Sequence, residues 1–416
     1  MNFKTSLLIG AAAVAATSLL AVTSHAKNLR WKMQSTWGSQ VAINGESAVY
    51  FSNKVKSLSD GKVQLRFHEP NALVPSLEVW DAVKNGSVDA GYTTPGYHAG
   101  KIPAVSYFTA VPFGPGATEY LGWFEYGGGK QLKDEIYGEY GLYSVNCLAH
   151  APETAGWFRK RINSVDELKG MKMRFFGLGA MVMNKIGVST QLLAGGDIYP
   201  ALEKGVIDAT EFSMPTHDLS YGFYQLAKFN YFPGWHQQTS VSELLMGLKA
   251  WQGLSKYQQS MINTACRDTM FWALVRSDAK QVPAMRELEK KGVTFVRWKD
   301  EDLAKLRGAA LKIGQLLSLE ANDFLPEQVT KMLGDLRNRN FHMPNYQLGE
   351  VLRENYGDNF LDKFSEFNET PIAAASIGQV HKCKYGNREL ILKIQYPKIR
   401  ESIESCLLYT SPSPRD

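Results

Sequence analysis

The sequence predicts an α/β fold with two lobes of similar build, followed by a shorter α+β segment. The first observation is a repeated unit in which a helix stops at glycine and a strand with Asp-Ala follows: WDAVKNGSVDAGY at 80–92 and ALEKGVIDATEF at 201–212. The second is that helical and strand-like patterns alternate over roughly the first 300 residues, as in α/β proteins. The third is a change of character near Leu306.

The first residues, 1–26, have the pattern of a secretory signal peptide. Lys4 precedes an apolar run from Ser6 to Val22, and Ser-His-Ala at 24–26 is a small-residue cleavage site. A transmembrane helix is the alternative, but the run is short for a span of about 20 residues. No later segment is apolar enough to cross a bilayer, so we expect an exported, soluble product.

The composition is that of a soluble globular protein of two or three domains, with 416 residues, 44% hydrophobic and 21% charged. A formal net charge of +5 with scattered basic residues gives no reason to expect a nucleic-acid partner. The four cysteines lack metal-site spacing. Cys147 and Cys266 would form a disulfide in an oxidising compartment, and the sequence leaves open whether they do.

The first lobe is predicted to open with a β-α-β unit and to repeat the pattern once. Its predicted elements are a strand at 29–33, a helix at 45–57, a strand at 63–67, a helix at 76–84 and a strand at 88–90. The loop from Thr93 to Lys101 follows the last of these strands. We expect this loop to be the first lobe's contribution to a ligand cleft, with Tyr97 stacking on a ligand or donating a hydrogen bond to it.

The second lobe is organised around the stretch from Gly170 to Met214. Apolar residues alternate with Lys172 and Arg174, which predicts a strand that breaks at Gly177, so Arg174 lies near its carboxyl end. The predicted helix at 178–186 directs its first amide groups and its dipole towards the same place. Both features favour a carboxylate or phosphate ligand.

A second acidic position is predicted beside Arg174. A strand at 190–193 leads to a turn with Asp197 as the N-cap of a helix at 198–204, and a buried strand at 206–209 ends just before Glu211. Ligands of open α/β sheets bind at the carboxyl ends of strands, so Arg174 and Glu211 should approach one crevice. The alternative is a purely structural salt bridge between them. Further predicted elements are helices at 219–229 and 253–290, the latter broken near Pro283, a strand at 292–296 and a helix starting at Lys299.

Five ordered motifs carry a family resemblance over about Asn28 to Asp300: AGWFRK at 155–160, DELKGMKMR at 166–174, GGDIYPALE at 195–203, GVIDATE at 205–211 and YFPGWH at 231–236. The chain here resembles the periplasmic solute-binding proteins of tripartite ATP-independent (TRAP) transporters, the DctP-like family, in the branch that includes 2-oxoacid binders. The resemblance implies a Venus-flytrap fold that closes over a small organic acid. It also implies a periplasmic location, the transporter's membrane subunits as partners, a homodimer and no enzymatic activity.

The resemblance also assigns roles to individual residues. Arg174 matches the arginine that binds the substrate carboxylate, for which a planar guanidinium is suited. Glu211 matches an acid that ligates a metal ion, and Phe212 stands where tryptophan is usual, although its backbone oxygen can still coordinate. Glu153 falls where glutamine is common and Gln237 where glutamate is common. With Tyr97 of the loop described above, the expected substrate-binding residues are Tyr97, Glu153, Arg174, Glu211, Phe212 and Gln237. The metal ligands that the resemblance implies are Glu153, Glu211 and Phe212.

Two facing carboxylates need a cation or a proton between them. We expect Ca²⁺ or Na⁺ that bridges the protein and a 2-oxo or hydroxy carboxylate, since these hard cations prefer oxygen ligands. A metal-free site that receives the ammonium group of a different acid is the alternative. A nucleophile assembled from Ser213, His217 and Asp218 lacks any nucleophile-elbow motif, so catalysis is not expected.

From about Leu306 three motifs resemble the UbiB-like atypical kinases: RGAALKIGQ at 307–315, PIAAASIGQVH at 371–381 and LILK at 390–393. The resemblance implies nucleotide-binding roles for Lys312, Gln315, Ala374, Ser376 and Lys393. By pattern alone Lys393 is an ordinary surface lysine of a strand. Phosphoryl transfer needs acids from a second kinase lobe, and none follow here, so a truncated fragment is expected.

The predicted domains are a signal peptide at 1–26, a two-lobe solute-binding domain at 27–305, a kinase-like fragment at 306–404 and a tail at 405–416. The tail, CLLYTSPSPRD after Ser405, resembles translated sequencing adapter. The whole therefore reads as a chimera. The alternatives are a genuine gene fusion and a nucleotide-binding atypical kinase fragment.

Overall fold

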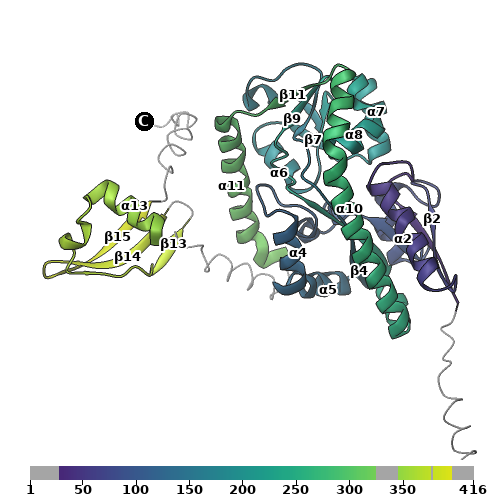
Figure 1. The fold of residues 1–416 in the computed structure, drawn as a ribbon, viewed down its shortest axis with the longest axis horizontal. Coiled ribbons are helices and arrows are strands. Elements are labelled where there is room, and N and C mark those ends of the chain that lie inside the picture. The colour runs from purple at the N-terminus through teal and green to yellow at the C-terminus, as the bar shows by residue number, and fades with distance from the viewer. Residues whose placement is uncertain (1–27, 325–344, 376–377, 396–416) are drawn as a thin grey trace, which may run out of the picture. The chain divides into compact units, whose positions relative to one another are not determined.

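The computed structural model describes residues 28–324, 345–375 and 378–395 (Figure 1). The chain divides into two compact units. Unit 1 comprises Met1–Thr93, Tyr137–Ala149 and Ser242–Arg276, and unit 2 comprises Thr94–Ile136, His150–Val241 and Ser277–Asp416. The predicted signal peptide and the tail at 405–416 lie outside the described residues. Among the described helices, none is long and apolar enough to span a bilayer.

Unit 1 is built on a five-stranded sheet with the order β2-β1-β3-β10-β4. Strand β1 is parallel to β2 and to β3, whereas β10 is antiparallel to β3. The strands are β1 (Leu29–Ser35), β2 (Val63–His68), β3 (Ala90–Thr93), β4 (Leu142–His150) and β10 (Ser240–Gly247). The helices between them are α2 (Asn44–Leu58), η1 (Ser76–Glu78), α3 (Val79–Lys84) and α9 (Leu248–Gln252), and α10 (Lys256–Lys290) begins in this unit.

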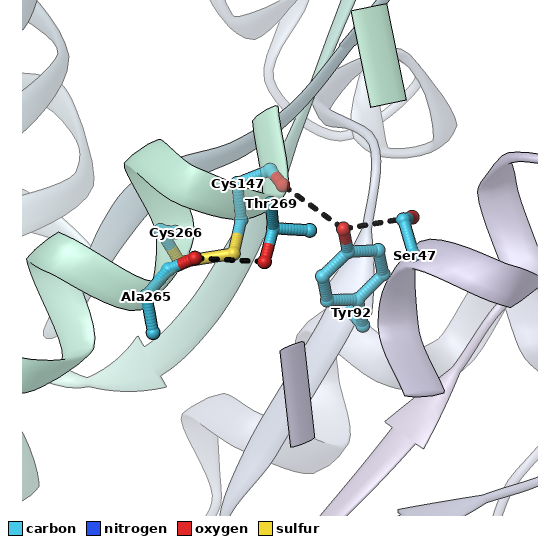
Figure 2. The surroundings of a disulfide bond; sticks show 6 residues. All are labelled: Ser47, Tyr92, Cys147, Ala265, Cys266 and Thr269. Carbon is cyan, nitrogen blue, oxygen red and sulfur yellow. Dashed lines mark hydrogen bonds between the residues drawn. A yellow bond between two sulfur atoms is a disulfide. The ribbon is translucent and has the colours of Figure 1, made fainter. Parts of the chain in front are cut away.

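A disulfide joins Cys147 of β4 to Cys266 of α10, both in unit 1, which answers the question that the sequence left open. Figure 2 shows its surroundings. The buried Tyr92 hydroxyl donates to the Cys147 carbonyl oxygen at 3.0 Å and lies 3.0 Å from Ser47 Oγ. Burial raises the pKa of Tyr92 well above its ordinary value, so the hydroxyl stays a donor. The disulfide therefore stands beside a hydrogen bond that ties β3 to β4.

Unit 2 contains a six-stranded sheet with the order β11-β9-β5-β8-β6-β7. Its central strands β6 and β8 are parallel, and β5 is antiparallel to β8 and to β9. The strands are β5 (Gly156–Phe158), β6 (Lys172–Arg174), β7 (Ser189–Gln191), β8 (Ala209–Thr210), β9 (Phe229–Phe232) and β11 (Thr294–Arg297). The helices are η2 (Pro95–His98), η3 (Pro103–Phe108), α4 (Ala117–Tyr126), α5 (Gly129–Glu139), η4 (Val165–Leu168), α6 (Gly177–Lys185), α7 (Gly195–Glu203), α8 (Pro215–Tyr221), η5 (Phe223–Gln225) and α11 (Asp300–Phe324).

The predicted repeat is confirmed down to one hydrogen bond. Asp89 Oδ2 accepts from the Lys32 backbone amide at 2.8 Å in unit 1, and Asp208 Oδ2 accepts from the Lys172 amide at 2.8 Å in unit 2. In each unit the aspartate precedes a strand and holds the neighbouring parallel strand. Strands β3 and β8 nevertheless begin later than predicted, because the apolar residues before them bond back to the preceding helix, as when the Val206 amide donates to the Ala201 carbonyl.

Three predicted helix boundaries were wrong. Helix α7 begins at Gly195, with Ala194 as its N-cap, so Asp197 lies in the first turn instead of capping it. Helix α8 begins at Pro215 and ends at Tyr221, and its C-cap Gly222 has a φ of 75°, the left-handed conformation that glycine adopts without strain. Helix α10 continues through Pro283 to Lys290. Proline and glycine at the ends of α8 were the signals that hydrophobic spacing alone overlooked.

The remaining described part holds α13 (Asn345–Tyr356), η6 (Phe360–Lys363) and a sheet of four strands: β12 (Glu366–Phe367), β13 (Ala373–Ala375), β14 (Gly378–Tyr385) and β15 (Arg388–Gln395). Its small core joins Leu348, Leu352, Phe360 and Ile394. Helix α11 runs as one helix across the predicted domain boundary at 305/306 and lies against α6 (Figure 1). Leu306 and Ala309 of this helix belong to the core of unit 2.

Candidate functional site

Arg174 and Glu211 meet at the carboxyl ends of two adjacent parallel strands, as the sequence predicted. Arg174 ends β6, and Glu211 follows β8. Arg174 Nη1 lies 2.7 Å from Glu211 Oε1 and donates to the Glu211 carbonyl oxygen at 3.0 Å. The two residues are 1% and 0% exposed. The salt bridge that the sequence offered as an alternative therefore exists, in a place where a ligand is also expected.

The Arg174 side chain is fixed on several sides. Its Nε donates to the Leu193 carbonyl oxygen at 3.2 Å, and its Cζ lies 5.1 Å from the centre of the Phe212 ring and 5.8 Å from that of Phe176. These rings contribute cation–π attraction in a buried place. The Nη2 group makes none of the hydrogen bonds named above. The guanidinium is thus held by hydrogen bonds from Nε and Nη1.

Glu153 brings a second buried carboxylate to the site. Its Oε1 accepts from Ser213 Oγ at 3.3 Å and lies 3.4 Å from His150 Nε2. Its backbone amide donates to the Gln237 carbonyl oxygen at 3.1 Å. Within residues 28–324, 345–375 and 378–395, neither Glu153 Oε2 nor Glu211 Oε2 has a hydrogen-bond partner, although both atoms are buried. Burying such an atom without a partner is costly, so these two oxygens are suited to bind a cation.

His236 completes the cluster, and it was absent from the predicted site residues. Its Nε2 lies 3.5 Å from Glu211 Oε2 and 3.6 Å from Glu153 Oε2. One ligand atom from each of the three residues lies within 4.8 Å of the other two, and all three side chains are buried. The family motif YFPGWH at 231–236 contains this histidine, but the motif alone gives it no role.

The three ionisable groups shift each other's pKa values. Burial raises the pKa of Glu153 above its ordinary value, against the opposing effect of His236 and His150. Burial also tends to raise the pKa of Glu211, but the Arg174 guanidinium and His236 bring this pKa below its ordinary value. Burial alone would lower the pKa of His236, and the two carboxylates instead raise it to about 9. Without a metal ion, the imidazolium is the cation between the two acids.

A pH dependence of stability follows for protein treated with a chelator. The folded-state pKa of His236, about 9, lies above its ordinary value of 6.5, so its stabilising contribution is complete below pH 6.5 and disappears as the pH rises through about 9. We expect the thermal unfolding midpoint to fall across this window. In the H236Q variant the midpoint should depend much less on pH. A wild-type midpoint that does not change between pH 6.5 and 9 would contradict the assignment of this titration to His236.

The other predicted substrate-binding residues lie around this cluster. Tyr97 of η2 packs edge-on against Phe176, with ring centres 5.6 Å apart. It belongs to unit 2, so the prediction that it comes from the first lobe was wrong, because the first segment of unit 1 ends at Thr93 and unit 2 begins at Thr94. Gln237 is 3% exposed, and its Oε1 has no hydrogen-bond partner among the described residues. The ring of Phe212 faces Arg174, and the binding role of its backbone oxygen stays a prediction.

Ser213, His217 and Asp218 do not form a nucleophilic triad. Ser213 Oγ lies 3.2 Å from His217 Nδ1, but the same hydroxyl donates to the Glu153 carboxylate. Asp218 accepts from Trp157 Nε1 at 2.6 Å, and burial raises the pKa of its carboxyl well above the ordinary value. These residues support Glu153 and the β5 strand instead of activating a serine.

The predicted nucleotide-binding residues are spread over α11 and the segment that holds β12 to β15. Lys312 is exposed on α11, and Lys393 is exposed on β15, opposite Val380 of β14. Ala374 lies in β13, opposite Gln379. Ser376 and the side chain of Gln315 lie outside the described residues. The nucleotide site stays a prediction.

Comparison with known proteins identifies relatives of the larger part of the chain. The family described as "Bacterial extracellular solute-binding protein, family 7" matches residues 34–316. A monocarboxylate 2-oxoacid-binding periplasmic protein of Nostoc sp. (strain PCC 7120) is 34% identical over 287 residues, covering 68% of this chain and 78% of that protein.

Solved structures agree with this match. A TRAP transporter solute-binding protein of Bordetella bronchiseptica RB50 superposes with a TM-score of 0.71 at 31% identity, covering 81% of this chain and 98% of that one. It is a mixed-occupancy dimer with copurified calcium and picolinate in one active site. A TRAP periplasmic solute-binding protein of Pseudoalteromonas atlantica T6c, with bound sodium and pyruvate, gives a TM-score of 0.70 at 28% identity, covering 82% and 100%. The predicted two-lobe α/β fold is confirmed by these neighbours.

The C-terminal part has different relatives. The ABC1 atypical kinase-like domain matches residues 335–411. The mitochondrial atypical kinase COQ8 of Saccharomyces cerevisiae is 46% identical over 105 residues, which cover 25% of this chain and 21% of that kinase. The chain thus spans about a fifth of the length of this kinase. The predicted recognition of two families in one chain is confirmed, in agreement with a chimera.

Proposed function

Because the chain belongs to the bacterial extracellular solute-binding proteins of family 7, we propose that the buried cluster in unit 2 binds a small carboxylate together with a metal ion. The protein would act as a periplasmic receptor that passes this acid to the membrane subunits of a TRAP transporter. The observation that carries the proposal is the pair of buried carboxylate oxygens, Glu153 Oε2 and Glu211 Oε2, without hydrogen-bond partners among the described residues.

The residues present fit a bound cation. The two unpartnered oxygens lie on the same side of the cluster, both within 3.6 Å of His236 Nε2, and the groups behind them keep them there. Ser213 and His150 occupy the other oxygen of Glu153, and Arg174 occupies the other oxygen of Glu211. The bound calcium and sodium of the related structures support a cation of this kind. A bound cation would polarise a substrate oxygen and fix its direction.

The ligand that best fits these groups is a 2-oxo or 2-hydroxy monocarboxylate. Its carboxylate would bind Arg174 through Nη2, since guanidinium and carboxylate form strong, directional hydrogen bonds. Its 2-oxygen would complete the coordination of the cation. Phe176 and Phe212 present aromatic faces beside the guanidinium and would contact an apolar substituent. The pyruvate and picolinate of the related structures have this arrangement of a carboxylate next to a second donor atom.

Chelation should therefore weaken carboxylate binding. We expect calorimetric titration of the full chain with pyruvate to show at least about a tenfold loss of affinity, about 1.4 kcal/mol, after removal of metal ions, and recovery when Ca²⁺ is added. Acetate lacks the 2-oxo oxygen of pyruvate and is the control ligand. Its affinity should change little when the chelator is added. An affinity for pyruvate that is unchanged by chelation would remove the metal ion from the proposal and leave the metal-free alternative.

The remaining assignments concern location and assembly. The related periplasmic and TRAP proteins support a periplasmic location and the transporter's membrane subunits as partners, and the dimer of the Bordetella protein supports a homodimer. The kinase-like part supplies none of the residues of the proposed site. Solute binding is not catalysis, so we propose that the family 7 part has no enzymatic activity.

A further inference from the structure

Strand β15 forms one edge of the sheet that holds β12 to β15. Strand β14 pairs with β15 on one side and with β12 and β13 on the other, whereas β15 pairs only with β14 among the described strands. Tyr385 and Arg388 flank a two-residue hairpin loop, and such flanking residues form a hydrogen-bonded pair. Since alternate residues of an antiparallel strand bond to opposite neighbours, Glu389, Ile391 and Lys393 direct their backbone groups away from β14.

This edge has few of the features that keep edge strands from pairing with other chains. Strand β15 is eight residues long and contains no proline, and its Leu390 and Ile391 are 43% and 60% exposed. Edge strands are usually short, interrupted or covered, because free N–H and C=O groups can extend the sheet into another chain. Ile391 also lines an open pocket of about 600 Å³. Lys393 alone would discourage pairing, but Glu389 supplies the opposite charge on the same face of the strand, and both side chains are exposed.

We infer that β15 pairs antiparallel with β15 of a second copy of this chain, with Ile391 opposite Ile391 of that copy. In this register Glu389 lies opposite Lys393 of the second copy, and the two-fold symmetry forms the same ion pair twice. Each residue of β15 that directs its backbone groups outward then meets a residue of the second copy that does the same. The ladder of hydrogen bonds can therefore form, and the two sheets become one.

Charge disfavours the other registers. Sliding one strand by two residues in either direction places Glu389 and Lys393 opposite uncharged residues, and sliding it by four places Glu389 opposite Glu389 or Lys393 opposite Lys393. Sliding by one residue sets outward-directed residues opposite inward-directed ones, so the hydrogen bonds are lost. A parallel arrangement without a shift brings like charges side by side. The inference does not depend on the proposed function, because none of these residues belongs to the cluster around Arg174.

Crosslinking of the full chain tests the pairing. In a C383S/C406S background, I391C places one thiol on each copy at the two-fold axis, one strand spacing or about 5 Å apart. The thiol crosslinker is chosen to be too short to span three strand spacings, about 14 Å. K382C is the matched control, because Lys382 is exposed and lies opposite Ile391 on β14, so its thiols would be three spacings apart. We expect a crosslinked dimer from I391C and at least about tenfold less from K382C.

Charge reversal tests the register. E389K and K393E each turn both attractive pairs into repulsive ones. We expect the protein concentration for half-maximal crosslinking through I391C to rise at least about tenfold in either variant. The double variant E389K/K393E restores opposite charges and should return to within about threefold of the unreversed protein. Both side chains are exposed, so the reversals should leave folding intact, and thermal unfolding checks this.

Three results would overturn the inference: no crosslink from I391C, an equal crosslink from K382C, or a double variant that stays as weak as the single reversals. A dimer that sedimentation detects but that I391C does not crosslink would overturn it as well. That last result would assign the dimer to the family 7 part and leave the homodimer proposed above standing.

Discussion

Replacing Arg174 by alanine is expected to abolish measurable carboxylate binding and to destabilise the protein. The guanidinium forms a 2.7 Å ion pair with Glu211 in a place where both residues are almost fully buried. Removing one partner of a buried pair leaves the other charge without compensation, which costs about 3–5 kcal/mol. The loss of the charged donor Nη2, which is the proposed partner of the ligand carboxylate, should lower the affinity for pyruvate at least about 100-fold. Calorimetry and denaturant unfolding measure the two effects separately.

Two further variants separate the roles of Arg174. Arg174→Lys keeps a positive charge near Glu211, but its single ammonium group cannot replace the three nitrogen donors of the guanidinium. We therefore expect stability to recover more than affinity does. Arg297→Ala removes an arginine that pairs with Asp300 on the surface of the same unit, and it should change neither quantity appreciably. Pyruvate affinity that survives in Arg174→Ala would rule out the carboxylate-binding role.

Removing the disulfide is expected to be the second large effect. Cys147 and Cys266 are separated by 119 residues, and the chain-entropy model gives a stabilisation of about 5 kcal/mol for closing a loop of this length. Losses measured for native disulfides are about 2–5 kcal/mol, so we expect the double variant C147S/C266S to unfold at markedly lower denaturant concentration. The hydrogen bond from Tyr92 to the Cys147 carbonyl oxygen would remain, because it uses the backbone.

The reduced wild-type protein is the matched comparison, since it keeps both sulfur atoms. It should unfold close to the double variant, whereas replacing the free Cys383 by serine should not shift the unfolding transition of the first unit. Equal stability of the oxidised protein and the double variant would mean that the crosslink does not restrain the unfolded chain.

Much of unit 2 could be predicted because its sequence signals are local. The alternation around Arg174, the break at Gly177 and the Asp-Ala strand before Glu211 each fix a short element, and parallel pairing of those elements follows from the α/β pattern. The meeting of Arg174 and Glu211 at one place could therefore be predicted from the sequence. The same reasoning found the repeated aspartate, although its hydrogen bond to the neighbouring strand appeared only in the structure.

The remaining features depend on tertiary contacts that no local pattern encodes. His236 follows a turn far from Glu153 in sequence, and only folding places its Nε2 beside two carboxylates. Tyr97 follows a strand of unit 1 but packs on Phe176, so its place is decided by the aromatic contact instead of by chain proximity. The disulfide likewise required the packing of α10 against β4, which cysteine spacing does not reveal.

In the proposed site, Glu153 would set the balance of charge between the protein, the metal ion and the ligand. Two acidic side chains and a bound monocarboxylate bring three negative charges, and Arg174 balances one of them. A divalent ion neutralises the remainder with neutral His236, whereas a monovalent ion leaves one negative charge in a low-dielectric interior, which is unfavourable. Glutamine at position 153 would have about the same size and could keep an oxygen towards the ion, and it would make a monovalent ion the neutral choice. In the proposed site, the exchange of one oxygen for nitrogen at position 153 would thus decide whether a divalent or a monovalent metal ion gives a neutral site.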